Sequence, residues 1–143
     1  MGYLSKKVAI VSPSLKANIQ QTLSIYFTIL DITTIYKGFN MKALLVNPNL
    51  KEVTEIEIEP TLEAIQNLIG FKTVDSDEID SNFDQLFFDE ECFIRQQDQV
   101  GRFKVDNLAP IVGMGVIVNT ADSKTFNSPK VGLSDLIKRV TFL

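Results

Sequence analysis

The chain has 143 residues, of which 45% are hydrophobic and 22% charged, proportions typical of one globular domain with its own core. Histidine is absent and Cys92 is the only cysteine, which excludes histidine-assisted nucleophiles, an internal disulfide and an ordinary zinc site. No run approaches the ~18 apolar residues that span a bilayer, and the apolar run after Lys6 and Lys7 is too short for a secretory signal. We therefore expect a cytoplasmic protein.

The net charge of −4 is unevenly distributed along the chain. Residues 1–40 carry four basic side chains and one acidic side chain, whereas residues 41–143 carry ten basic and 17 acidic ones. The composition therefore changes sign near Met41.

The first forty residues predict a β-α-β unit. Residues 6–12 are apolar and β-branched, which is typical of a buried strand, and Ser12-Pro13 is a good helix start. Residues 31–38 predict a second strand. Between the two strands, apolar side chains recur at helical spacing: Leu15, Ile19, Leu23, Tyr26, Phe27 and Leu30.

From Met41 onward the pattern predicts a β-hairpin followed by a helix. Residues 41–47 are a buried strand, Asn-Pro-Asn marks a turn, and residues 52–59 alternate as a half-buried strand should. Pro60-Thr61 opens a short helix, and Gly70 is suited to end it.

The remainder contains weaker signals. The acidic stretch 75–84 predicts a solvated loop, and residues 86–94 predict a strand pair or a strand with a tight turn at 89–91. Residues 96–107 predict a polar loop, residues 109–119 a glycine-interrupted strand, and residues 132–140 a last helix.

These elements together predict an α+β fold within one domain, residues 1–143. Its sheet is mixed but mostly antiparallel, with about seven strands, and about three helices pack on one side of it.

From Met41 on, the chain resembles domain of unknown function 3846, a family of small proteins encoded mostly by phages, plasmids and their bacterial hosts. The resemblance covers residues 41–119. It is carried by the start MKALLVNPN, a helix ending in LIG, an acidic turn around FDEE, and Asn107 ahead of IVGMGVIVN.

The chain departs from the family pattern in two places. Glu91 and Cys92 stand where the family tends to place glycine, and residues 1–40 have no counterpart. The resemblance implies mobile-element biology, no established reaction, and a common core that begins at Met41. Residues 1–40 are then an extension whose apolar helix face packs onto the core or forms a homodimer contact. That face consists of Ile19, Leu23 and Phe27.

The most conspicuous candidate site is a run of acids: Asp75, Asp77, Glu78, Asp80 and Asp84. A solvated loop is the simplest interpretation, because blocks of like charge are usually exposed. The alternative is a protein-binding surface, extended by Asp89, Glu90 and Glu91, that occupies a basic groove on a nucleic-acid-handling protein.

Metal chemistry fits this run poorly. Counted from Asp75 as the first position of a calcium loop, Ile79, Asp80 and Leu86 occupy positions five, six and twelve, which require an oxygen ligand, glycine and glutamate. A two-metal site would also need ligands from other strands. We therefore expect neither a metal nor a cofactor.

The other candidates favour structural roles. Cys92 has no histidine to activate it, and the glycines at 101, 113 and 115 lack phosphate-loop spacing. Asn107 predicts a turn. A faint nucleic-acid pattern is outweighed by interleaved acids, so direct nucleic-acid binding is not expected. It consists of Arg95, Arg102 and Lys104 near Phe93 and Phe103.

The sequence thus favours a non-enzymatic accessory protein of a mobile element, which binds a host protein through its acidic surface. Inhibition of a defence system, of the anti-restriction or anti-CRISPR type, is the concrete form of this hypothesis. The alternative is a structural or small-ligand-binding module that self-associates through the N-terminal helix.

Overall fold

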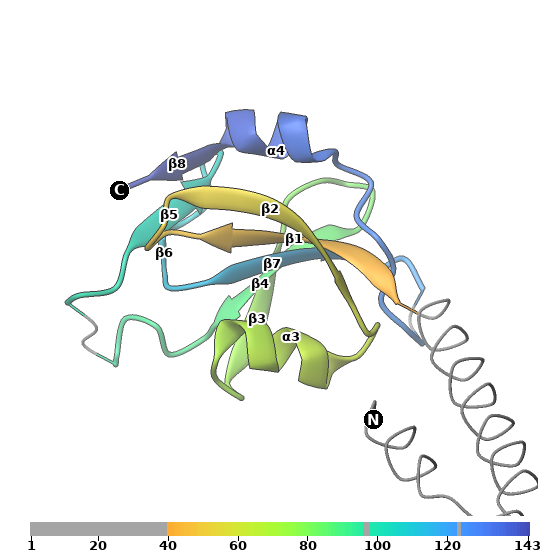
Figure 1. Cartoon of the computed structure of the whole chain (residues 1–143), viewed down its shortest axis with the longest axis horizontal. Helices are drawn as coiled ribbons and strands as arrows, with labels where there is room; N and C mark the ends of the chain where they lie inside the picture. The colour runs from red at the N-terminus through yellow and green to blue at the C-terminus, as the bar shows by residue number, and fades with distance from the viewer. Residues whose placement is uncertain (1–39, 96–97, 123) are drawn as a thin grey trace, which may run out of the picture. The chain divides into compact units, whose positions relative to one another are not determined.

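The computed structural model of the protein describes residues 40–95, 98–122 and 124–143. The chain divides between Phe39 and Asn40 into two units, and the second unit contains every element labelled in Figure 1. The predicted strands 6–12 and 31–38 lie outside the described residues. So does the helix between them, with Ile19, Leu23 and Phe27.

Two antiparallel sheets form the frame of this unit. The larger sheet has the strand order β2-β1-β7-β4-β3, and the smaller has the order β6-β5-β8. The strands of the larger sheet are β1 (Met41–Asn47), β2 (Glu52–Ile58), β3 (Val74–Glu78), β4 (Asp84–Asp89) and β7 (Gly115–Asn119). Those of the smaller are β5 (Arg102–Val105), β6 (Ile111–Val112) and β8 (Val140–Phe142).

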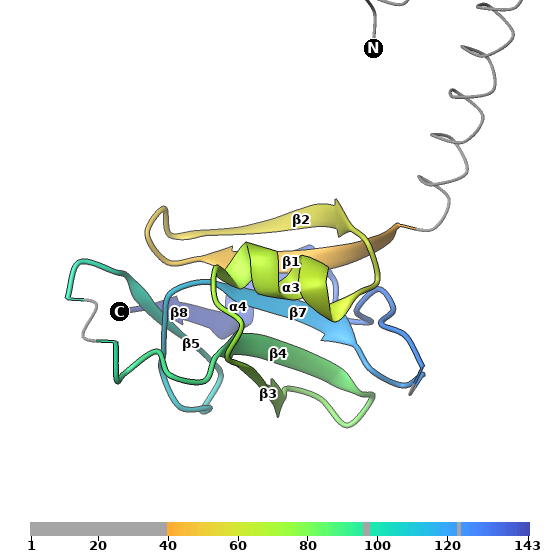
Figure 2. The same ribbon diagram turned by 90° about the horizontal axis from the view of Figure 1, so that it is seen from below.

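The larger sheet is covered on both faces. Helix α3 (Leu62–Ile69) packs on one face, and the smaller sheet with helix α4 (Leu133–Arg139) packs on the other (Figures 1 and 2). Along β1, Ala43 faces α3 while Leu44 and Val46 face the smaller sheet, as the period of two in a strand requires.

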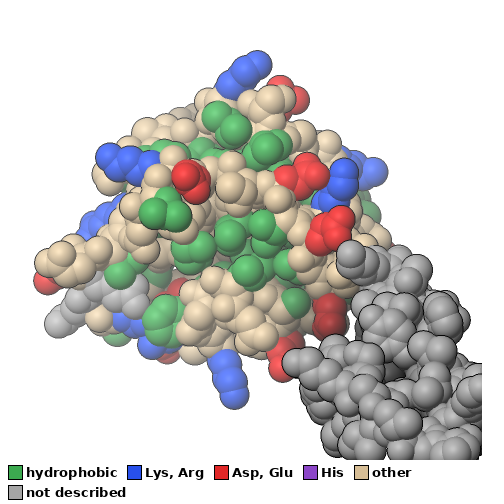
Figure 3. All heavy atoms as spheres, viewed as in Figure 1, with side chains coloured by type: hydrophobic (Ala, Val, Ile, Leu, Met, Phe, Trp, Pro, Cys, Tyr) green, Lys and Arg blue, Asp and Glu red, His purple; other side chains and the backbone are tan. Residues whose placement is uncertain are grey.

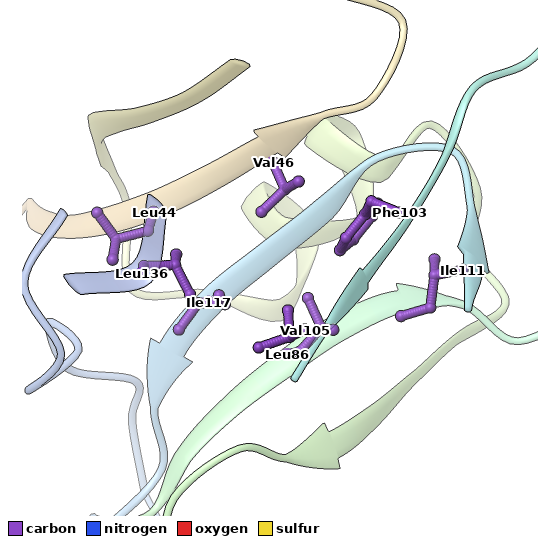
Figure 4. Close-up of a cluster of buried hydrophobic side chains, with 8 residues drawn as sticks. All are labelled: Leu44, Val46, Leu86, Phe103, Val105, Ile111, Ile117 and Leu136. Carbon is purple, nitrogen blue, oxygen red and sulfur yellow. The ribbon is translucent and has the colours of Figure 1, made fainter. Parts of the chain in front are cut away.

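The core between the sheets is drawn in Figure 4, where side chains from β1, β4, β5, β6, β7 and α4 point toward one another. Central strand β7 is buried at all five positions. Val116 and Val118 face α3, and Ile117 faces the smaller sheet. A strand buried on both faces needs a continuous apolar run, which explains why GVIVN shows no polar alternation.

Helix α3 has the ends that the sequence predicts. Thr61 Oγ1 accepts a hydrogen bond from Ala64 N at 3.1 Å, satisfying one of the free donors of the first turn. Gly70 ends the helix in the left-handed conformation, with φ 89°, and its N–H donates to Gln66 O.

The α+β class and the mostly antiparallel pairing are confirmed, but several predicted details are wrong. Every strand pairing of the described residues is antiparallel, and these residues contain two helices, which lie on opposite faces of the larger sheet. Strand β3 replaces part of the predicted loop 75–84, and β5 interrupts the predicted loop 96–107. The predicted strand 109–119 breaks at Gly113, with φ 92°, so its halves β6 and β7 join different sheets.

Candidate protein-binding site

The acidic run belongs to an ordered β-hairpin. Strands β3 and β4 pair from Val74 opposite Asp89 to Glu78 opposite Gln85, and residues 79–83 turn the chain. The prediction of a loop is therefore wrong for residues 75–78 and 84, which belong to strands. Strand β3 forms one edge of the larger sheet, and β2 forms the other (Figure 2).

Three of the five predicted site residues lie on β3. Alternation along the strand directs Asp75 and Asp77 to the face that carries the smaller sheet, and Glu78 to the face that carries α3. Asp75 and Glu78 are exposed and Asp77 is half-buried. Among the residues that the structure describes, none of the three forms an ion pair. Their charges therefore remain available to a partner.

Asp80 is already engaged within the fold. Its carboxylate accepts from Arg139 Nη1 at 2.9 Å, and the same guanidinium donates to Asp106 Oδ2 at 2.6 Å and to the Ile79 carbonyl at 3.1 Å. The hydrogen bonds that Arg139 donates, chiefly those to Asp106 and next those to Asp80, raise the pKa of Arg139. Arg139 thus joins the turn of the β3–β4 hairpin to α4 and the end of β5.

Asp84 is not a surface acid, contrary to the prediction. It is 0% exposed, and its carboxylate accepts hydrogen bonds from Asn119 Nδ2 at 2.9 Å, Lys130 N at 2.9 Å and Val131 N at 2.8 Å. A buried carboxylate is tolerated because these donors replace water. Asp84 therefore fastens the chain near Lys130 to the larger sheet.

Asp89, which the sequence places in the acidic surface, is a second buried acid. Asp89 is 3% exposed and binds Arg95 Nε at 2.6 Å and Thr73 Oγ1 at 2.6 Å. Burial raises the pKa of Asp89, but hydrogen bonds from Arg95, Thr73 and the Glu91 N–H outweigh it and hold the pKa below its ordinary value of 3.8. The Arg95 guanidinium also lies 3.9 Å from the Phe71 ring centre. This cluster fixes the turn after β4.

Phe83 is a feature of this hairpin that the sequence does not reveal. It is 52% exposed and has φ 72°, a conformation that bulky side chains rarely adopt. Its carbonyl accepts from the N–H and the hydroxyl of Thr120, at 3.0 and 3.2 Å, which holds the strained turn in place.

The surface of the fold also has shallow hollows with mixed linings. One, of about 400 Å³, lies between the start of α3 and residues 120–126, where Pro60, Leu62 and Phe126 meet Asp122 and Lys124. No group of His, Cys, Asp and Glu in the described ranges has the arrangement of a metal site. Figure 3 shows a central hydrophobic area on one face, with charged side chains spread around its margin.

The remaining candidates have structural positions. Cys92 is buried, and Arg102 lies 6.0 Å from the exposed Phe93 ring. A side chain at Gly101 would lie 2.6 Å from the Pro48 carbonyl oxygen, so close backbone packing explains that glycine. Asn107 is exposed in the turn after β5.

The chain matches no protein-family model, no curated protein and no solved structure. The resemblance to domain of unknown function 3846 therefore stays a prediction. No helix of the described residues is long and apolar enough to cross a membrane.

Proposed function

We propose that this protein acts by binding rather than by catalysis, and that the acids of β3 occupy a basic surface on a host protein. The observation that carries the proposal is the position of Asp75, Asp77 and Glu78 on an edge strand without ion-pair partners among the described residues. They lie on an ordered strand at the margin of a sheet, and no described residue neutralises them. Closely spaced like charges on a rigid strand favour association with a surface of opposite charge.

The proposed surface is smaller than the sequence predicted. Asp80 is paired with Arg139, and Asp84 is buried under the chain near Lys130. Reversing their charge would break the fold before it tested a partner. The β3 acids form no ion pair with the described residues, and reversing them removes only the local hydrogen bond from Ser76 N to Asp75 Oδ1, so they carry the proposal alone.

The resemblance to phage and plasmid proteins supports the biological side of the proposal. We infer a mobile-element accessory protein in the bacterial cytoplasm, and anti-restriction or anti-CRISPR activity is its most direct form. A small acidic protein that covers a nucleic-acid-binding groove would inhibit without chemistry.

A comparison of two charge-reversal variants tests this function. Asp75→Lys/Asp77→Lys/Glu78→Lys reverses β3, and Glu52→Lys/Glu57→Lys/Glu59→Lys makes the same change in net charge at exposed positions on and beside β2. We expect only the β3 variant to lose the host protein captured by the wild type. The loss should be tenfold or more, because several charge pairs of about 0.5–1 kcal/mol are removed and made repulsive.

Affinity measured against the purified partner at low and high salt completes the test. Wild-type binding should weaken as salt rises, because exposed charges are screened. Equal capture by both variants, with both folded, would contradict the proposal.

A further inference from the structure

The outer edge of β3 has a defined pattern of main-chain groups. Glu90 N donates to the Thr73 carbonyl at 2.7 Å, and Ile79 N donates to the Asp84 carbonyl at 3.0 Å. In an antiparallel ladder such hydrogen-bonded pairs recur at every second residue. The main chain of Asp75 and Asp77 therefore faces β4, and that of the three residues between and beside them faces outward: Val74, Ser76 and Glu78.

Two of the outward N–H groups already have an acceptor in a neighbouring residue of the chain. Val74 N donates to the Lys72 carbonyl at 3.0 Å, and Ser76 N donates to Asp75 Oδ1 at 2.8 Å. The outward carbonyls of Val74, Ser76 and Glu78 face away from β4, and the described residues place no strand on that side. The edge thus presents main-chain acceptors together with carboxylates, so it is suited to a partner rich in donors.

We propose that the outer edge of β3 binds an extended basic segment of a partner protein as an additional antiparallel strand. Main-chain N–H groups of that segment would donate to the outward carbonyls, as in other cases of strand addition. Its lysine or arginine side chains, at every second position, would lie opposite Asp75 and Asp77. This inference rests on the proposed function and names the structural class of its partner.

The geometry explains why the added strand must be basic. Asp75 and Asp77 would lie in the closely spaced pairs that share no main-chain hydrogen bond, where opposing side chains approach most closely. A basic side chain opposite Asp75 would draw its carboxylate away from Ser76 N, which frees that N–H to pair with the incoming strand. A second copy of β3 would instead place acid against acid, so the same residues disfavour self-association.

Both ends of the edge are fixed before any partner binds. Thr73 Oγ1 donates to Asp89 at one end, and Asp80 is held by Arg139 at the other. A preformed edge requires little ordering on association, which favours affinity. On β2, by contrast, Glu55 is already paired with Lys42 at 3.3 Å.

A synthetic peptide tests the inference on the full chain. The probe is the acetylated, amidated heptapeptide Lys-Thr-Lys-Thr-Lys-Thr-Lys, whose lysines would face Asp75 and Asp77 and whose threonine N–H groups would face the edge. Two further peptides carry N-methyl groups on all threonines or on the inner lysines. We expect methylation of the main-chain nitrogens of the inner lysines to change the dissociation constant less than about threefold. Methylation of the main-chain nitrogens of the threonines should weaken binding at least tenfold, since only these N–H groups donate to β3.

Protein variants supply the matched control. Asp75→Asn/Asp77→Asn should weaken binding of the unmethylated peptide severalfold, while Glu55→Gln/Glu57→Gln on β2 should leave it unchanged. The two methylated peptides binding equally well, or no binding of the parent peptide, would overturn the inference.

The outcomes separate the two proposals. Host-protein capture that depends on the β3 acids, combined with equal binding of both methylated peptides, would retain the acidic surface and reject strand addition. The opposite result is also informative. If the methylated peptides behave as expected but charge reversal of β3 does not affect capture of the host protein, strand addition at β3 is retained and the proposed function is rejected.

Discussion

Gly115 lies at the start of β7 and packs against Phe103 of the smaller sheet and Leu86 of the larger sheet. A Cβ atom at this position would lie 2.5 Å from Phe103 Cζ and 2.8 Å from Leu86 Cδ1. Both neighbours are fully buried, so neither can move without disturbing the core. The core therefore has no room for a side chain at this position.

Gly115→Ala should lower the free energy of unfolding by about 1–3 kcal/mol, the usual cost of overpacking. Urea unfolding measures the effect. Gly132→Ala is the control, because its Cβ would meet nothing closer than Asp135 Oδ2 at 4.0 Å. Adding Phe103→Leu to Gly115→Ala should recover part of the lost free energy of unfolding, because the smaller side chain makes room for the new Cβ atom. Equal stability of Gly115→Ala and Gly132→Ala would refute this packing argument.

Asp89 should give the fold a dependence on acid pH. Its folded-state pKa lies below the ordinary value of 3.8, so the charged carboxylate is favoured by folding. The stabilisation is fully present above that ordinary value and is lost as the pH falls through the folded-state pKa. Asp89→Asn should reduce stability at pH 7 and flatten the decline below about pH 4.

Urea unfolding between pH 2 and 7 measures this dependence, with exposed Glu57→Gln as the control. An unchanged acid limb in Asp89→Asn would show that other groups determine it.

At the level of elements, prediction succeeded where local signals were complete. β1, β2 and α3 have apolar periodicity, an Asn-Pro-Asn turn, a threonine cap and a terminal glycine, all of which are local. β3 was missed because its alternating positions hold acids, and a sheet edge tolerates charge where a core strand does not. β5 and β8 are four and three residues long, too short for a local signal, and they form strands by pairing with each other and, for β5, with β6.

The candidate site was predicted only in part, for a similar reason. An aspartate in an acidic run looks exposed unless its donors are known, and those of Asp84 lie 35, 46 and 47 residues further along the chain. Asp75, Asp77 and Glu78 could be identified as acidic. The direction of their side chains could not, because it follows from pairing with β4.

The contact between Asp84 and the chain before α4 predicts a local effect. In Asp84→Asn one acceptor oxygen is replaced by an NH₂ donor that faces other donors. We therefore expect the free energy of unfolding to fall by about 1–3 kcal/mol. Hydrogen exchange should accelerate most at the amides of Lys130 and Val131, which donate to Asp84. Half-buried Asp77→Asn is the control, and uniform acceleration across the sheet would contradict a local role.

At the scale of the whole molecule, the division between Phe39 and Asn40 predicts an autonomous core. The core between the sheets and the apolar side chains packed around α3 draw on residues between Met41 and Phe142. A fragment of residues 40–143 should therefore unfold in one cooperative transition. Urea unfolding followed by circular dichroism tests this, and an aggregated fragment or one without a transition would mean that residues 1–39 complete the fold.

The position of β7 also determines the order in which the larger sheet can be completed on the ribosome. β1 and β2 can pair early, and so can β3 and β4, but the two hairpins share no ladder. β7 lies between the two hairpins and is synthesised more than 60 residues after β1. The inner edges of β1 and β4 therefore stay unpaired until β7 is available. Until β7 has emerged, the nascent chain holds two apolar half-sheets whose unpaired inner edges are open to aggregation.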